Sequence, residues 1–222
     1  EELGVPQISV NEDGNVSQEV MDALMPKLQP DLREVLSYLL ADCPWELYWY
    51  DKTAGVRSEA GIRYAVAQEV NPEDNTSYYV LHVSEFEMKY SFAVAGEYRE
   101  SENTLYKTDV RLAQSAKDAA GKASAIVAAN AGLNDYEKLE AYKDSICGLV
   151  SYNHGAVENN SAYGNPWQLI WVFDENPDTG VVCEGYAKAF QYLCDMSVFR
   201  SGDVKCYTVN GTMGGGTGFG GH

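Results

Sequence analysis

Cys183 is the residue of this chain best suited to covalent chemistry. It follows a polar loop, 174–180, and it opens a run in which Ala187, Phe190 and Cys194 recur at helical spacing. We therefore expect the thiol in the first turn of a helix, where unpaired backbone N–H groups and the positive end of the helix dipole favour thiolate over thiol. The thiolate is the nucleophilic form of cysteine, so the pattern predicts a reactive side chain. Glu184 points elsewhere on this helix and is not expected to act as its base.

His222 is the expected base for this thiol, because a nucleophilic cysteine needs a nearby group that takes its proton. It follows the glycine-rich run 214–221. That run lacks the lysine and the following helix of a phosphate-binding loop. We expect a mobile loop in which Gly220 lets a substrate chain approach closely. The backbone N–H of Cys183 is the expected oxyanion donor, together with one side chain that the sequence does not identify.

The residues around Cys183 resemble the transglutaminase-like superfamily of papain-like cysteine enzymes. Bacterial members carry a pattern close to Gly-Val-Cys-x-Gly-Tyr-Ala-x-Ala-Phe. The matching positions here are Gly180, Val182, Cys183, Gly185, Tyr186, Ala187, Ala189 and Phe190, with a shift of one residue at the first glycine. Gly221-His222 resembles the opening of the family's His-Ala-Trp-Asn-like strand, and 136–152 resembles the helix that precedes the cysteine. The resemblance covers roughly residues 133–222.

This resemblance implies an α+β fold with a papain/transglutaminase-like core, in which the cysteine helix packs on an antiparallel sheet. It implies hydrolysis or transfer of the acyl groups of peptide or isopeptide bonds through a thioester on Cys183, with His222 as base and no cofactor. Trp167, Tyr186 and Gly220 are the expected substrate contacts. The family completes its catalytic triad with an aspartate on a later strand, so we expect this acid beyond His222 in a longer chain.

Two other interpretations stay open. The first is an inactive transglutaminase-like surface module that binds protein or glycan through its aromatic N-terminal half. The second, much weaker, is a zinc protein that uses Cys206, His154 and His222. The sequence has no Cys-x-x-Cys pair and no Cys/His spacing typical of zinc, so no metal ligand is assigned.

Composition limits the classes of molecule that the chain is expected to bind. The 222 residues carry a net charge of −17, which disfavours nucleic acid because phosphate binding needs clustered lysine and arginine. A membrane-spanning helix needs roughly 18 consecutive apolar residues, and the sequence has no such run. The chain shows no signal peptide, but its Glu-Glu-Leu-Gly start resembles a trimmed terminus. The acidic charge and the resemblance together favour a secreted or cell-surface bacterial protein with a peptide or protein substrate, including cell-wall peptide.

The five cysteines fit one working thiol and four others, which could form two disulfides or none. Cys147 and Cys194 have apolar neighbours, and we expect both to be buried in helices.

Periodicity and turn residues divide the chain into two expected parts. Residues 1–132 form an N-terminal α+β extension. Its expected helices lie at 17–25 (capped by Ser17), 31–41 and 107–130. Its expected strands lie at 61–70 and 78–95, with an aromatic strand or edge segment at 45–50. Residues 133–222 form the transglutaminase-like core, with a helix to about residue 149, a polar loop at 153–166, a buried run at 167–173, the Cys183 helix and a strand at 204–209.

Overall fold

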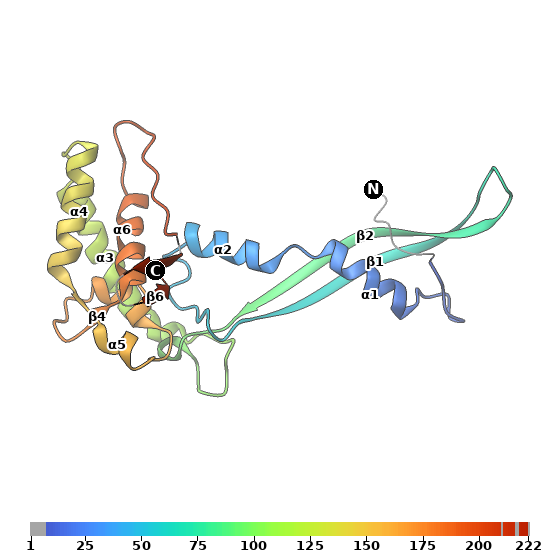
Figure 1. Cartoon of the computed structure of the whole chain (residues 1–222), viewed down its shortest axis with the longest axis horizontal. Helices are drawn as coiled ribbons and strands as arrows, with labels where there is room; N and C mark the ends of the chain where they lie inside the picture. Colours follow the sequence, from blue (N-terminus) through green and yellow to red (C-terminus); the bar gives the residue numbers. More distant parts are fainter. Residues whose placement is uncertain (1–7, 210, 216–217, 222) are drawn as a thin grey trace. The chain divides into compact units, whose positions relative to one another are not determined.

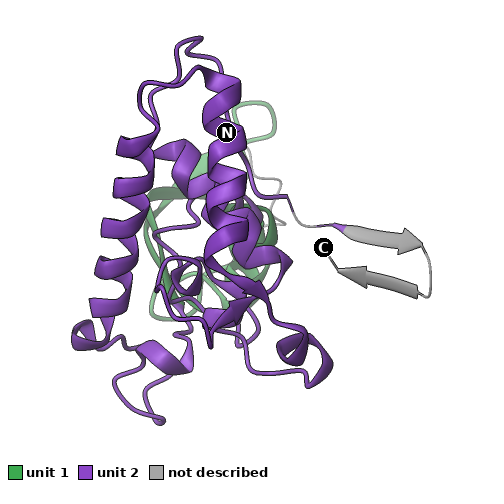
Figure 2. Ribbon diagram, turned by 90° about the vertical axis from the view of Figure 1, so that its left-hand side faces the viewer, with its two compact units in different colours: residues 1–35, 57–91 green, residues 36–56, 92–222 purple. Residues whose placement is uncertain are grey.

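The computed structural model of the chain is an α+β structure, made of helices and a small amount of sheet (Figure 1). The structure describes residues 8–209, 211–215 and 218–221. The chain divides into two compact units, 1–35 with 57–91 and 36–56 with 92–222 (Figure 2). The boundary expected after residue 132 lies inside the second unit.

The first unit contains helix α1 (Gln18–Leu28) and a long hairpin of strands β1 (Val56–Val70) and β2 (Ser77–Phe92). Ser17 caps α1 as predicted, because its hydroxyl accepts the Val20 N–H at 3.4 Å. Between the strands, Asn71 N–H donates to the Thr76 carbonyl at 2.8 Å, which closes the predicted turn. β1 starts five residues earlier than expected, because the strand follows the length of its partner rather than its own hydrophobic alternation.

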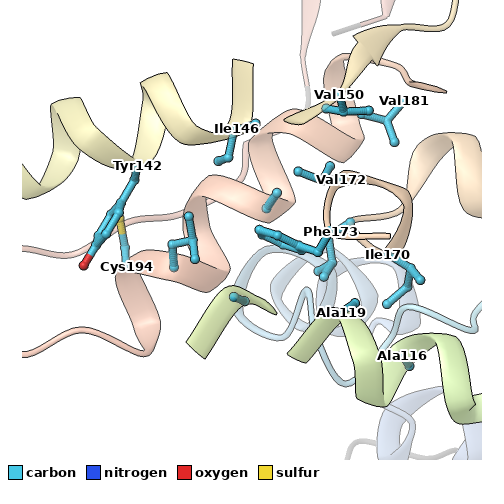
Figure 3. Packing of buried hydrophobic residues seen from close by; sticks show 14 residues of the cluster. Ala116, Ala119, Tyr142, Ile146, Val150, Ile170, Val172, Phe173, Val181 and Cys194 are labelled. Atoms are coloured by element: carbon cyan, nitrogen blue, oxygen red, sulfur yellow. The ribbon is translucent and has the colours of Figure 1, made fainter. Parts of the chain in front are cut away.

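The second unit is built around helix α6 (Cys183–Asp195), which packs against α3 (Gln114–Ala129), α4 (Asp135–Leu149) and the 3-10 turn η4 (Ile170–Val172). Helix α2 (Leu32–Asp42) has most of its length in this unit. Figure 3 shows the buried side chains that gather between these elements. They are Ala116, Ala119, Ala123, Tyr142, Ile146, Val150, Leu169, Ile170, Val172, Phe173, Val181, Ala189, Leu193 and Cys194. The alanines of α3 let it approach closely. The run at 167–173 is buried as predicted, except that Trp167 and Trp171 are half-buried.

Helix α3 begins later than the predicted residue 107. Residues 110–113 form the 3-10 turn η2 (Val110–Ala113) instead, because the Asp109 carboxylate accepts the Arg111 N–H at 2.9 Å. Further upstream, Asp109 N–H donates to the Tyr98 carbonyl, so this backbone turns away from a helical path.

Helix α4 begins with a reciprocal capping box. Asn134 accepts the Glu137 N–H, and the Glu137 carboxylate accepts the Asn134 N–H, each at 3.0 Å. The helix buries a narrow stripe at four-residue spacing, Lys138, Tyr142 and Ile146. Cys147 lies one position off this stripe and is exposed, so the prediction that it is buried is wrong. The same prediction for Cys194 is confirmed.

Three further segments differ from expectation. The predicted strand at 204–209 is absent from this described stretch, since Thr208 N–H donates to the side chain of Gln191 and not to a neighbouring strand. The segment at 45–50 forms turns, and its ladder pairing is limited to an isolated bridge between Tyr50 and Val94. The loop at 153–166 contains a short helix, α5 (His154–Glu158), and the 3-10 turn η3 (Asn165–Trp167).

Two small sheets and one further turn complete the unit. β3 (Ser151–Tyr152) pairs in parallel with β4 (Gly180–Val181), and η1 (Gly96–Tyr98) is a 3-10 turn. Part of the glycine-rich run, expected to be a loop, forms the antiparallel pair β5 (Thr212–Gly215) and β6 (Gly218–Gly221). Glycine makes the same backbone hydrogen bonds as other residues, so it can join such a ladder. Within the described residues, no helix has the length and apolar character needed to cross a bilayer.

Candidate active site

Cys183 is the first residue of α6, as predicted. Val182 before it is extended, with φ −90° and ψ 179°, and its carbonyl accepts the Gly185 N–H at 2.9 Å. A hydrogen bond from Val182 N–H to the Pro166 carbonyl, 2.8 Å long, fixes the backbone just before the helix. The turn from extended strand to helix therefore places the thiol beside the first-turn N–H groups.

Cys183 opens into a cavity of about 650 Å³ in the second unit. The lining residues are Lys52, Thr53, Asn160, Ser161, Ala162, Tyr163, Trp167, Cys183, Glu184 and Gly211. Trp167, an expected substrate contact, thus shares this cavity with Cys183. Its indole lies against the ring of Tyr163, with centroids 5.7 Å apart. The cavity has an aromatic wall beside a nucleophile, and its volume is in the range of small-molecule and peptide side-chain pockets.

Tyr152, which no pattern in the sequence singled out, lies against Cys183. Burial raises the pKa of Tyr152, and the charge of the Cys183 thiolate and a hydrogen bond from the Tyr152 hydroxyl to the Cys183 sulfur raise it further. The Cys183 backbone N–H donates to the same phenol oxygen, and this hydrogen bond lowers the pKa of Tyr152. The phenol therefore touches both the predicted nucleophile and its predicted oxyanion donor. Tyr152 lies 31 positions before Cys183, and the parallel pairing of Tyr152 with Val181 helps to bring the two together.

Tyr186, the second expected substrate contact, supports Tyr152. The two rings stack with centroids 6.4 Å apart and an interplanar angle of 13°. The Tyr186 hydroxyl donates a hydrogen bond to the Val150 carbonyl at 2.9 Å, which fixes the position of the ring. The His154 ring also lies near, with its centroid 4.9 Å from that of Tyr152. Tyr152 thus contacts two aromatic neighbours as well as the thiol.

A buried polar network is centred on Glu184, the residue that follows Cys183. The Glu184 carboxylate forms ion pairs with Lys52 at 2.7 Å and with Lys188 at 2.9 Å, and it accepts the Tyr163 hydroxyl at 2.7 Å. Lys188 also donates to Gln168 Oε1 at 2.8 Å. This network explains why Glu184 is not free to serve as the base of its neighbour. No pattern in the sequence indicated the roles of Lys52 and Gln168, because both are far from Glu184 along the chain.

Burial and neighbouring charges together shift the pKa values of this network. Burial acts to raise the pKa of Glu184, but the charges of Lys188 and Lys52 outweigh it, so this pKa is lowered. Burial lowers the pKa of Lys188, against the attraction of Glu184. Burial and the nearby Glu184 charge both raise the pKa of Tyr163, which keeps its hydroxyl protonated as a donor.

Two glycines of the cysteine motif allow backbone to approach closely. A Cβ on Gly185 would lie 2.7 Å from Val181 Cβ and 2.9 Å from the Gln168 carbonyl oxygen. A Cβ on Gly180 would lie 2.8 Å from the Ser151 carbonyl oxygen, on the neighbouring strand. All three distances are shorter than normal contacts, so these positions need glycine to bring β4 and the start of α6 into place.

The remaining predicted site residues are placed as follows. Gly220 lies in β6, opposite Met213 of β5. His222 lies outside the described residues. Among the described residues, no group of three or more histidine, cysteine, aspartate and glutamate side chains could hold a metal ion.

Comparisons of the chain with protein-family models, with curated proteins and with solved structures give no match.

Proposed function

We propose that this chain is a transglutaminase-like cysteine enzyme with a papain-like core, acting on peptide or isopeptide amide bonds. The observation that carries the proposal is the position of Cys183, at the first residue of a helix and on the wall of a cavity of about 650 Å³. A thiol at a helix start is favoured as thiolate, and a cavity beside it has room for an acyl group. In this proposal, α6 is the central helix of the core and the glycine-rich hairpin belongs to its antiparallel sheet.

The proposed reaction has two steps. The Cys183 thiolate attacks the amide carbon, and the amine leaves with a proton from the His222 imidazolium, which produces a thioester on Cys183. Water then gives a proton back to His222 and attacks the thioester, which releases the acid and the thiolate. An amine in place of water would give transfer instead of hydrolysis. The Cys183 N–H stabilises the oxyanion in both steps, and Tyr152 is the candidate for the second donor.

The proposed substrate is a peptide or protein, including cell-wall peptide, met outside a bacterial cell or at its surface. Trp167 would contact the acyl side of the substrate from the wall of the cavity. The net charge of −17 disfavours nucleic acid as a partner.

The second candidate function is an inactive binding module of the same fold. It is favoured by the exposed tyrosines of β2, Tyr78 and Tyr79, which are 41% and 39% accessible. Tyrosine is common in protein-binding surfaces because it offers a large rigid ring with one polar tip.

Alkylation by iodoacetamide near neutral pH distinguishes the two functions. Mass spectrometry gives the rate at each cysteine, and Cys147 is the matched control because it is an exposed thiol that does not line the cavity. A nucleophilic Cys183 is expected to react at least about tenfold faster than Cys147. An activated ester such as a p-nitrophenyl ester should also acylate Cys183 in a burst that is lost in Cys183→Ser. Equal rates at Cys183 and Cys147, with no acylation, would support the binding module instead.

A further inference from the structure

The thiols of Cys194 and Cys206 meet at the far end of α6, away from the Cys183 site. Cys194 is in the last turn of the helix and is 5% accessible. Cys206 is half-buried and packs against the same hydrophobic cluster that contains Cys194. The two side chains are joined by a hydrogen bond in which the Cys194 S–H donates to the Cys206 sulfur.

The backbone around Cys206 is fixed by a separate contact. Thr208 N–H donates to Gln191 Oε1 at 2.7 Å, and the same amide donates through Nε2 to the Ala41 carbonyl at 2.5 Å. Gln191 is buried and lies three positions before Cys194, so both project from one face of α6. The segment 204–209 is thereby held along the helix with Cys206 opposite Cys194.

The pair is also open to a reagent. Both cysteines line a second cavity of about 390 Å³, together with Asp195, Lys205 and Tyr207. A small disulfide can therefore reach a pair of thiols that would otherwise be closed off in the core.

The two thiols differ in acidity, which determines the order of reaction. The hydrogen bond from Cys194 lowers the pKa of Cys206, against burial and the charge of Asp195. The same hydrogen bond and burial raise the pKa of Cys194. Cys206 is thus the attacking thiolate, and Cys194 is the thiol that resolves the intermediate.

We propose that Cys194 and Cys206 form a redox-dependent disulfide that fastens the segment 204–209 to the end of α6, with a small-molecule disulfide such as oxidised glutathione as the oxidant. The Cys206 thiolate attacks one glutathione sulfur and releases the other glutathione as a thiolate, which takes the proton of Cys194. The Cys194 sulfur then attacks Cys206 and releases the second glutathione. Two protein thiols are oxidised and one small disulfide is reduced to two thiols. This inference is independent of the function proposed for Cys183.

The test uses the full chain, reduced and then incubated with oxidised glutathione. Remaining thiols are alkylated, and the chain is digested and analysed by mass spectrometry. We expect one cross-linked product that joins the peptides of Cys194 and Cys206, lighter by two hydrogens than the two peptides together. Cys43 and Cys147 should be recovered alkylated.

Thermal unfolding provides a second readout. Closing the loop between residues 194 and 206 should raise the Tm of the oxidised chain by roughly 5 to 10 °C over the reduced chain. The increase should vanish in Cys206→Ser and persist in Cys147→Ser, which removes an exposed thiol outside the pair. Recovery of Cys194 and Cys206 as alkylated residues, or a cross-link from Cys206 to Cys43, would overturn the proposal even if Cys206→Ser fails to fold.

Discussion

Lys188 Nζ lies 2.9 Å from Glu184 Oε1, one helical turn apart on α6, and both side chains are almost wholly removed from solvent. Glu184 directly follows Cys183, so this ion pair fixes the turn of helix that carries the thiol. It also connects that turn to Tyr163 and Lys52 on the cavity wall. The start of α6 is therefore held by a polar network as well as by apolar packing.

Replacing Lys188 by methionine should destabilise the fold strongly. The change leaves the buried Glu184 carboxylate with one cation fewer, and breaking a buried pair in this way costs about 3 kcal/mol or more. The free energy of unfolding from urea titration measures it. Lys143→Met is the matched control, because Lys143 pairs with Asp144 at the exposed surface, where such pairs contribute at most about 1 kcal/mol. Equal losses for both variants would contradict a special role for the buried pair.

Acid should weaken the fold through Glu184. Its pKa is lowered in the folded state from an ordinary value of 4.5, so its ionised form stabilises the fold fully above that value. This contribution is lost as the pH falls through the lower folded-state pKa. Glu184→Gln removes the titrating group and should be less stable than the unmodified chain at neutral pH. The difference in unfolding free energy between the two chains should narrow as the pH falls below the ordinary carboxyl pKa of 4.5. A gap that stays constant with pH would exclude this linkage.

Gly185→Ala should destabilise the start of α6. The new Cβ would lie 2.7 Å from Val181 Cβ and 2.9 Å from a backbone oxygen, and such overpacking costs about 1–3 kcal/mol. Gly121→Ala in α3 is the matched control, because a Cβ there meets nothing within 4 Å. That change should stabilise the helix by up to about 1 kcal/mol. Thermal unfolding of the two variants should therefore shift in opposite directions.

Tyr152→Phe should slow the alkylation of Cys183. The variant keeps the ring contacts with His154 and Tyr186 and removes only the hydroxyl that donates to the sulfur. Loss of one hydrogen bond to a thiolate that is partly open to solvent should lower the rate near neutral pH by about 3- to 10-fold. Tyr136→Phe, at a residue 73% accessible on α4, should leave the rate unchanged. A rate unaffected by Tyr152→Phe would show that the hydroxyl does not stabilise the thiolate.

Much of the local structure was predictable from short stretches of sequence. The start of α6 at Cys183 was predictable because an extended loop precedes a run with helical periodicity. The cap at Ser17, the turn after β1 and the burial of 167–173 were predictable in the same way. Each depends on residues within a few positions of one another, where steric limits, capping and hydrophobic spacing act directly on the backbone.

Only the tertiary structure decided which distant groups meet these elements. Tyr152 reaches Cys183 through the pairing of β3 with β4, and Lys52 reaches Glu184 from 132 positions earlier in the chain. Cys147 is exposed because α4 buries a stripe only one residue wide, and 204–209 is not a strand because its hydrogen-bond partner is the side chain of Gln191. Such outcomes depend on which segments pack together, and this is set by the burial of the whole core rather than by the preferences of any short stretch.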